Sequence, residues 1–416
     1  MTDPKDIQIK DYTYPLTDDR IPKYPLAQRD ASKLLVYDKG DISQRVFRQL
    51  PELLPEGSLM VMNNTRVIQA RLHFRKAAAE GQTGALIEIF CLEPHEPRDY
   101  VLMFQQTKSC QWMCLVGNAK KWKQGPLERI ISVGDRQLTL RATRISTAGG
   151  EAVVEFDWND ADVTWAQVLE ATGELPIPPY LNRATEQSDM QTYQTVYSKV
   201  KGSVAAPTAG LHFTPEVLAG IDARGIERAE LTLHVGAGTF RPVKSEQLGG
   251  HQMHAEWIYV PRAVVQALLR HGGECTAIGT TSVRTLESLY YIGCHIIANP
   301  EATEDDLRVE QWEPYSLKAD EAGFTPTVIE ALEAIDEWML RKGVDALHTA
   351  TRIIIVPGYK YHIVRRMVTN FHQPESTLLL LVAAFVGERQ WRDIYRYALD
   401  NGFRFLSYGD SSLLMP

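Results

Sequence analysis

The chain has 416 residues, of which 44% are hydrophobic and 23% charged, the composition of an ordinary globular protein. Its net charge of −8 excludes a broadly basic nucleic-acid-binding surface, although it permits a local basic patch. A chain of this length exceeds one compact core, so we expect two or three domains.

Targeting and membrane signals are missing from the sequence. The N-terminus has neither the apolar core nor the cleavage pattern of a signal peptide, and the longest apolar run, Leu378 to Val386, is far shorter than the roughly 20 residues of a membrane helix. Five cysteines, an odd number without the paired spacing of a structural zinc site, indicate reduced thiols. We therefore expect a cytoplasmic protein without a membrane segment.

The first part of the chain changes character near residue 70. The stretch SLMVMNNTRVIQARL (58–72) predicts a strand that enters a turn at Asn63-Asn64-Thr65, with Arg66 directly after it. Short alternating runs separated by glycine turns follow, namely ALIEIFCL, YVLMF, RIISV, LTLRAT and AVVEFDW. Such runs predict an antiparallel all-β domain, residues 71–169, inserted between residues 1–70 and 170–416 of a discontinuous α/β domain.

Helices and strands alternate from about residue 205. Thr214-Pro215 predicts the start of a helix, and the strand ELTLHV (230–235) follows it. Further elements in order are a helix at 261–270, the strand CTAIG, a helix from Thr280, a charged helical addition at 295–345, the strand RIIIV, and a helix from Ser376 to Gly387. The fold class that we expect is mixed α/β and multi-domain, with the α/β domain built around a barrel-like β core.

Polar side chains gather where these strands end or helices begin. The stretches are NNTRV (63–67), PTAGLHF (207–213), TLHVGAGTF (232–240), HQMH (251–254), GTTSVRTLE (279–287) and TNFHQPEST (369–377). Ligand sites of α/β proteins are built at such positions. The glycines of VGAGT lack the GxGxxG spacing, so they predict a tight turn with close backbone approach rather than a dinucleotide site.

Histidine is the informative residue type in these stretches, which hold His212, His234, His251, His254 and His372. Imidazole titrates near neutral pH, which suits acid–base catalysis. The competing use is a catalytic zinc site, with His251 and His254 joined by His212 or His234, although HQMH is not HExxH. At GTTSVRTLE, Arg284 and free helix N–H groups suit a carboxylate, whereas Thr280, Thr281 and Ser282 are also consistent with simple helix capping.

Nine stretches together resemble, in order, the signature blocks of a known family. They are NNTRVIQARL, LPIPPYL, YQTVYS, SVAAPTAGLHFT, LTLHVGAGTFRPV, HQMHAE, GTTSVRTLES, VTNFHQPESTLLLLV and FRFLSYGD. The family is that of the S-adenosylmethionine:tRNA ribosyltransferase-isomerases of queuosine biosynthesis. The inserted β region is similar by position and strand pattern more than by residue identity.

The resemblance implies an unusual reaction. The ribosyl group of S-adenosylmethionine is transferred to 7-aminomethyl-7-deazaguanine at the tRNA wobble position and isomerised, giving epoxyqueuosine-tRNA, adenine and methionine. S-adenosylmethionine is then a consumed substrate, with no tightly bound cofactor and no metal. The implied partners are this tRNA and S-adenosylmethionine, and we expect a monomer.

The same resemblance suggests roles for residues. His212 and His372 are the leading acid–base candidates, with His234 and His254 next, and Asp410 is a partner for the amine or the sulfonium. The expected substrate-binding residues are Asn63, Asn64 and Arg66 for ribose or base, Asn370, and the carboxylate anchor of Arg284, Thr280, Thr281 and Ser282. Lys120, Lys121 and Lys123 around Trp122, with Arg365 and Arg366, are the expected tRNA contacts.

Some positions depart from the family pattern. Gln69 stands where the NTRVI block of the family usually continues with proline. Gln373 replaces the hydrophobic residue that usually follows TNFH, and the 295–345 connection is longer than in most members. Two alternatives therefore stay open. One is a paralogue with a different acceptor or only an RNA-binding role, and the other is a metal-dependent hydrolase.

Overall fold

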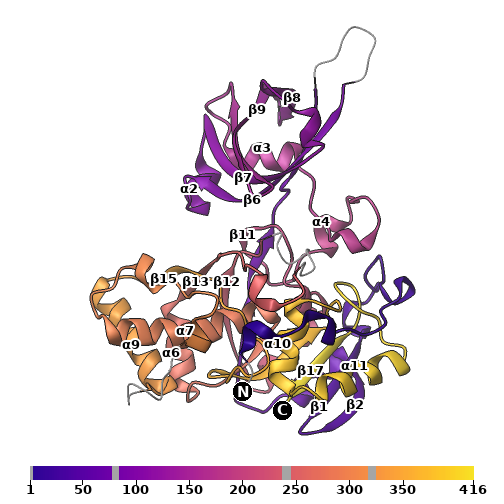
Figure 1. The fold of residues 1–416 in the computed structure, drawn as a ribbon, viewed down its shortest axis with the longest axis vertical. Helices are drawn as coiled ribbons and strands as arrows, with labels where there is room; N and C mark the ends of the chain where they lie inside the picture. Colours follow the sequence, from indigo (N-terminus) through magenta and orange to yellow (C-terminus); the bar gives the residue numbers. More distant parts are fainter. Residues whose placement is uncertain (1–2, 77–83, 237–244, 317–324) are drawn as a thin grey trace.

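Two β-sheets, one of nine strands and one of six, organise the chain (Figure 1). The structure, a computed structural model, describes residues 3–76, 84–236, 245–316 and 325–416. In spatial order the nine-stranded sheet consists of β15 (Ala346–Thr351), β13 (Glu256–Pro261), β12 (Glu227–Leu233), β3 (Leu59–Asn63), β14 (Cys275–Ile278), β16 (Val364–Asn370), β17 (Ser411–Met415), β1 (Lys33–Asp38) and β2 (Asp41–Val46). Its four middle strands β12, β3, β14 and β16 run parallel to one another.

Helices cover both faces of this sheet, which explains why strands such as LMVMN (β3) and CTAI (β14) are buried along their whole length. Leu35 packs into one core cluster, whereas its neighbour Leu34 packs into the cluster on the opposite face. The first face is covered by α6 (Arg262–Arg270), α7 (Thr280–Ala298), α9 (Val328–Lys342), α10 (Thr377–Val386) and α11 (Gln390–Asp400), and the second by α1 (Leu50–Leu53) and α5 (Pro215–Ala223).

The six-stranded sheet stands above the larger α/β part (Figure 1). Its strands are antiparallel, in the order β5 (Arg71–Arg75), β6 (Leu86–Glu96), β7 (Ser109–Gly117), β10 (Glu151–Trp158), β9 (Arg136–Ala148) and β8 (Leu127–Val133). Its two edges approach each other, because Arg129 Nη1 on β8 donates to the carbonyl oxygen of His73 on β5 at 3.1 Å. Helix α3 (Trp165–Thr172) packs inside, with the Trp165 ring 4.8 Å from that of Phe156.

Short elements connect the two parts. Strands β4 (Thr65–Val67) and β11 (Val200–Ser203) pair in parallel near the junction. The α-helices of the described ranges are completed by α2 (Tyr100–Gln105), α4 (Asp189–Thr192) and α8 (Glu313–Ser316). The core of the six-stranded sheet is separate, although Ile68, Ala70 and Val204 join it from outside residues 71–169. The boundaries at residues 70 and 169 stay a prediction. No described helix is both long and apolar enough to cross a membrane.

The mixed α/β fold with an inserted antiparallel β-sheet is confirmed. The barrel-like sheet is the six-stranded one, whereas the nine strands of the α/β part form a series that ends at β15 and β2. Two predicted strands were wrong. YVLMF forms helix α2, whose first turn is capped by Asp99 accepting from Leu102 N at 2.8 Å. RIIIV is irregular chain that follows β15, and Ile354 N bonds to Gln311 O at 3.3 Å instead of to a sheet.

Candidate active site

The carboxyl ends of the parallel strands meet at one edge of the nine-stranded sheet. Asn63 ends β3, Gly279 follows β14, and Asn370 ends β16. Ligands of open α/β sheets bind beyond this edge, and here a cavity of about 330 Å³ opens. It is lined by residues of segments 205–209, 235–236, 251–254, 279–281, 369–373, 376–378 and 406–407, with Tyr180, Tyr193, Glu256 and Arg284.

Five of the six polar stretches therefore contribute to one cavity, whereas the sixth, NNTRV, is outside the lining and touches it through the bond of Asn63 to Thr281. The position of Gln373, one of the departures from the family pattern, is in the lining. The predicted tight turn of VGAGT falls partly within residues 237–244, outside the described residues.

The N-terminus of α7 faces the cavity through Gly279, Thr280 and Thr281. Gly279 has φ 83° and ψ 154°, a conformation open mainly to glycine, and no side chain caps this helix end. Thr281 Oγ1 accepts from Asn63 Nδ2 at 3.2 Å, and Ser282 Oγ donates to Ile278 O at 2.7 Å. The capping interpretation of these hydroxyls is therefore wrong. The helix end offers its N–H groups and positive dipole to the cavity.

Arg284 and Glu256 form a buried ion pair at the cavity wall, each with 6% of its side chain exposed. Arg284 Nη1 contacts Glu256 Oε2, and Nε donates to Ile353 O at 3.2 Å. The remaining nitrogen, Nη2, is buried and has no hydrogen-bond partner among the described residues. The guanidinium thus keeps unused donors beside the helix end.

Glu256 was not predicted as a site residue. Its signal in the sequence is the alternation of EWIYV, in which Glu256, Ile258 and Val260 occupy the buried face of β13. A carboxylate on the apolar face of a strand needs a partner, and here the partner is Arg284.

His372 also lies in the cavity wall. Its Nε2 lies 2.9 Å from Thr369 Oγ1, its backbone N–H donates to the Tyr395 hydroxyl at 3.0 Å, and its carbonyl oxygen accepts from Tyr14. Burial lowers the pKa of His372 to about 4, so the imidazole is neutral near pH 7. Nδ1 has no partner among the described residues, which leaves it available to a ligand. Sequence reasoning did not predict these supporting residues, and Tyr14 is too distant in sequence to give a signal.

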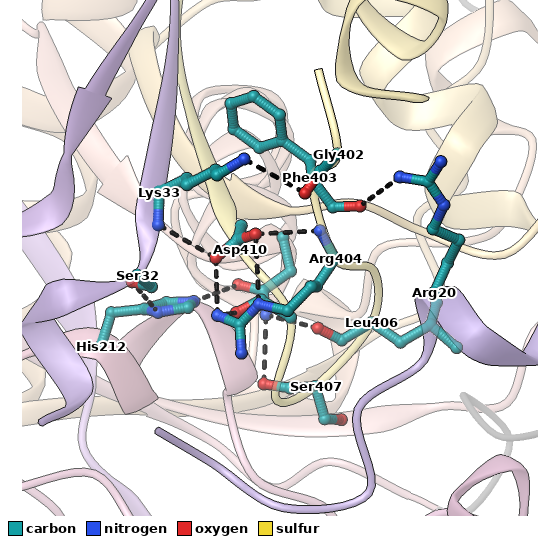
Figure 2. Close-up of polar contacts among 12 residues, drawn as sticks. Arg20, Ser32, Lys33, His212, Gly402, Phe403, Arg404, Leu406, Ser407 and Asp410 are labelled. Carbon is teal, nitrogen blue, oxygen red and sulfur yellow. Dashed lines mark hydrogen bonds and ion pairs between the residues drawn. The ribbon is translucent and has the colours of Figure 1, made fainter. Parts of the chain in front are cut away.

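His212 does not line the cavity. Its Nε2 lies 3.2 Å from Asn370 Oδ1. Its Nδ1 lies 2.8 Å from Ser32 Oγ (Figure 2). Burial lowers the pKa of His212 to about 4. The cavity-lining residue here is Asn370, and His212 lies one side chain behind it.

His234 lies between the two sheets and is not in the cavity lining, although the next residue, Val235, is. Its Nδ1 is 3.0 Å from Thr65 Oγ1, and its ring centroid is 4.2 Å from that of Tyr100 on α2. Burial lowers its pKa to about 3. Asn64 and Arg66 are also outside the lining. Asn64 bonds to Thr232 Oγ1 at 2.7 Å, and Arg66 is exposed on β4.

Asp410 is a structural residue of the loop that follows Phe403. Its carboxylate accepts from Lys33 N and Arg404 N, both at 2.9 Å, and pairs with Arg404 Nη2 at 2.7 Å (Figure 2). Only 1% of it is exposed. Asp410 therefore holds the loop whose residues Leu406 and Ser407 line the cavity, and it does not itself reach it.

His251 and His254 line the cavity, His254 with an exposed side chain. Burial lowers the pKa of His251. Gln311, from the 295–345 segment, braces this loop by donating to His251 O at 2.8 Å and accepting from Met253 N at 2.9 Å. The zinc ligand set considered above is not assembled, and in the described part of the chain no three His, Cys, Asp or Glu side chains are grouped to hold a metal ion.

The predicted tRNA contacts lie in two places. Lys120 and Lys121, in the short 3₁₀ helix η6 (Ala119–Lys121), and Lys123 are exposed on the inserted domain. Trp122 between them is buried and bonded to Gly125 O at 2.9 Å, so it is not available for base stacking. Arg365 and Arg366 lie at the start of β16, whereas Asn370 lines the cavity at its end. Arg365 bonds to Glu274 and Arg366 to Thr276, each at 3.0 Å.

Comparison with known proteins gives a consistent result. A family model described as "Queuosine biosynthesis protein" matches residues 9–318 and 322–414. S-adenosylmethionine:tRNA ribosyltransferase-isomerase of Thermosynechococcus vestitus is 36% identical, over 100% of this chain and 98% of its own length. The protein of the same name from Citrifermentans bemidjiense is 35% identical, over 98% and 99%.

Among solved structures, an S-adenosylmethionine tRNA ribosyltransferase from Thermotoga maritima aligns with 97% of this chain and 100% of its own, at 26% identity and a TM-score of 0.44. The family model spans nearly the whole chain, and the curated relatives align with it almost from end to end. The chain therefore belongs to the queuosine biosynthesis protein family, and both of these curated relatives carry the name S-adenosylmethionine:tRNA ribosyltransferase-isomerase.

Proposed function

We propose that this chain transfers and isomerises the ribosyl group of S-adenosylmethionine onto 7-aminomethyl-7-deazaguanine at the tRNA wobble position, and that the cavity is its active site. Adenine and methionine are released, and epoxyqueuosine-tRNA is the product. The observation that carries this assignment to the cavity is the convergence of five separate segments on one wall that holds a helix N-terminus, a buried ion pair and a neutral histidine.

The methionine part of the substrate fits the end of α7. Its carboxylate would accept from the free N–H groups at Thr280 to Ser282 and from Arg284 Nη2, since a helix N-terminus and a guanidinium both favour an anion. The carboxylate of Glu256, beside Arg284, would face the ammonium or the sulfonium. The anchor therefore binds a zwitterion, negative at one end and positive at the other.

His372 is our candidate for proton transfer. The sulfonium acidifies the neighbouring 5′ carbon, and loss of that proton gives an ylide that expels adenine. His372 is neutral and has a free Nδ1, so it would take the 5′ proton and pass it to the departing adenine. The aminomethyl group of the acceptor then attacks as a neutral amine, and methionine leaves.

The tRNA would contact Lys120, Lys121 and Lys123 by its phosphates. These side chains are exposed and have no acidic partner among the described residues, whereas Arg365 is already paired with Glu274. Loss of one phosphate contact should reduce, by about one, the magnitude of the slope of log K for tRNA binding against log salt concentration. That the protein acts as a monomer stays a prediction.

A turnover assay on tRNA that bears 7-aminomethyl-7-deazaguanine tests the proposal, with adenine release and ribosyl incorporation scored together. His372→Ala should lower turnover by roughly 10²–10⁴ while S-adenosylmethionine still binds. His271→Ala, a substitution outside the cavity lining, is the control and should leave turnover unchanged. Adenine release without incorporation into this tRNA would point to a different acceptor, and an inert wild-type protein would refute the proposal.

A further inference from the structure

A buried chain of hydrogen bonds runs from the N-terminal segment to the cavity wall, and Figure 2 labels Ser32 and His212 at one end of it and Leu406 and Ser407 at the other. Ser32 Oγ lies 2.8 Å from His212 Nδ1, and His212 Nε2 lies 3.2 Å from Asn370 Oδ1. Asn370 Nδ2 then donates to the carbonyl oxygens of Leu406 at 2.9 Å and Ser407 at 3.2 Å. Ser32, His212 and Asn370 are each at least 96% buried, so water does not compete for these bonds.

The donor and acceptor roles in this chain are fixed by its last step. Carbonyl oxygens only accept, so both protons of Asn370 Nδ2 are used, and the amide oxygen must be the atom that faces His212. Since an amide oxygen also only accepts, His212 Nε2 must carry a proton. A neutral imidazole has one N–H, and Nδ1 therefore accepts from the Ser32 hydroxyl.

This arrangement leaves His212 without a route for proton transfer. Nε2 already gives its proton to an oxygen that has none of its own to pass on, and Nδ1 is occupied by Ser32. The ring is also held in place by Phe47, whose centroid is 5.0 Å away. What His212 does control is the direction of the Asn370 amide, and Asn370 reaches the cavity.

We propose that His212 is a positioning residue, which with Ser32 fixes the Asn370 amide so that Oδ1 presents its remaining lone pair to an O–H or N–H donor of the bound nucleoside. The inference rests on the proposed function for the nature of that ligand. The same amide holds the cavity wall on its other side, because it bonds to Leu406, a non-glycine residue with a φ of 65° whose own N–H donates to Phe371 O at 3.1 Å.

Three substitutions separate positioning from acid–base chemistry. In His212→Gln the side-chain amide supplies an N–H near the place of Nε2 but cannot titrate in the neutral range. We expect it to stay within about tenfold of the wild type in kcat/KM, whereas His212→Ala loses roughly 100-fold with weaker S-adenosylmethionine binding. Ser32→Ala keeps the imidazole and should lose only a few fold.

The pH profile of His212→Gln should keep both limbs of the wild-type profile. If that variant instead falls as far as His212→Ala, with unchanged affinity for S-adenosylmethionine and a lost limb, His212 is an acid or base and the proposal is overturned. Thermal unfolding of each variant shows whether it is folded.

A second measurement needs no turnover. Nitrogen-15 NMR of labelled histidine near neutral pH should show His212 as the neutral Nε2–H tautomer in the wild type and also in Ser32→Ala, because Asn370 Oδ1 still accepts from Nε2 when Ser32 is removed. An Nδ1–H tautomer or an imidazolium in the wild type would overturn the proposal. The tautomer can be measured even if the wild-type protein does not transfer ribosyl. Failure of the proposed function can therefore be told apart from failure of the positioning role of His212.

Discussion

Arg284 cannot be replaced by another basic residue without losing a contact, because its planar guanidinium pairs with Glu256 and still has Nη2 without a hydrogen-bond partner among the described residues. Arg284→Lys keeps a positive charge beside Glu256 but loses the second set of donors. We expect the Kd for S-adenosylmethionine to rise by roughly 10- to 100-fold, measured by titration calorimetry.

The matched control is Arg262→Lys, which alters a two-bond pair with Asp336 outside the cavity lining, at 2.7 and 2.8 Å, and should leave that Kd unchanged. Arg284→Met, which strands the Glu256 carboxylate, should lower the free energy of unfolding by about 3–5 kcal/mol. An unaltered Kd in Arg284→Lys would remove Arg284 from the binding site.

Residue types and positions predicted part of the site. Arg284, His372 and Asn370 were expected from sequence and line the cavity, while His212, His234 and Asp410 were expected and do not. The difference lies in their neighbours. Ser32 is 180 positions from His212, and Tyr100, which covers His234, lies on helix α2 between β6 and β7, so sequence shows that an imidazole is present without showing what surrounds it.

Helix α7 needs glycine before its first residue. Gly279 has φ 83° and ψ 154°, where a side chain costs about 1–3 kcal/mol, and a Cβ there would lie 3.6 Å from Ala209 Cβ. Gly279→Ala should therefore both lower stability and weaken S-adenosylmethionine binding, as read by denaturant unfolding and by titration.

Gly343→Ala provides the comparison. Gly343 ends α9 with φ 67° and open space around its Cα. Alanine there should lower the free energy of unfolding by about 1–2 kcal/mol without any effect on ligand binding. Equal ligand affinity in the two variants would mean that the start of α7 does not bind S-adenosylmethionine.

Elements with explicit end signals were predicted well. Thr214 and Ser376 cap α5 and α10 through bonds to Val217 N and Leu379 N, as their sequences indicate. RIIIV carries no such signal, and YVLMF carries only the Asp99 that precedes it, while a short apolar run by itself fits a helix, a strand or buried irregular chain equally well. The local Asp99 cap decided α2, whereas a tertiary partner, the 309–311 segment, decided residues 352–354.

The whole molecule should be sensitive to mild acid. Burial sets the pKa of His212 and His372 at about 4 and of His234 at about 3 in the folded state, against about 6.5 when unfolded. The unfolded chain thus binds protons that the native state does not, so stability is complete above about pH 6.5 and falls as the pH drops toward about 4.

In that pH range each of these histidines lowers the free energy of unfolding by up to about 1.4 kcal/mol for each unit by which the pH falls. Denaturant unfolding from neutral pH down to about pH 5 measures the slope of the free energy of unfolding against pH. In His372→Gln this slope should be shallower, because one fewer group takes up a proton on unfolding. A flat profile across this range would contradict the assigned burial of the three imidazoles.

Strand β17 lies between β16 and β1, although it is the last strand of this sheet in the sequence. During translation, β1 and β2 therefore leave the ribosome hundreds of residues before the strand that joins them to the rest of the sheet. A nascent polypeptide stalled before residue 411 holds two unjoined parts of one sheet, with the edges of β16 and β1 bare. Such an intermediate should be cut readily by proteases and retained by chaperones, and the capacity to bind substrate should appear only when synthesis has passed residue 415.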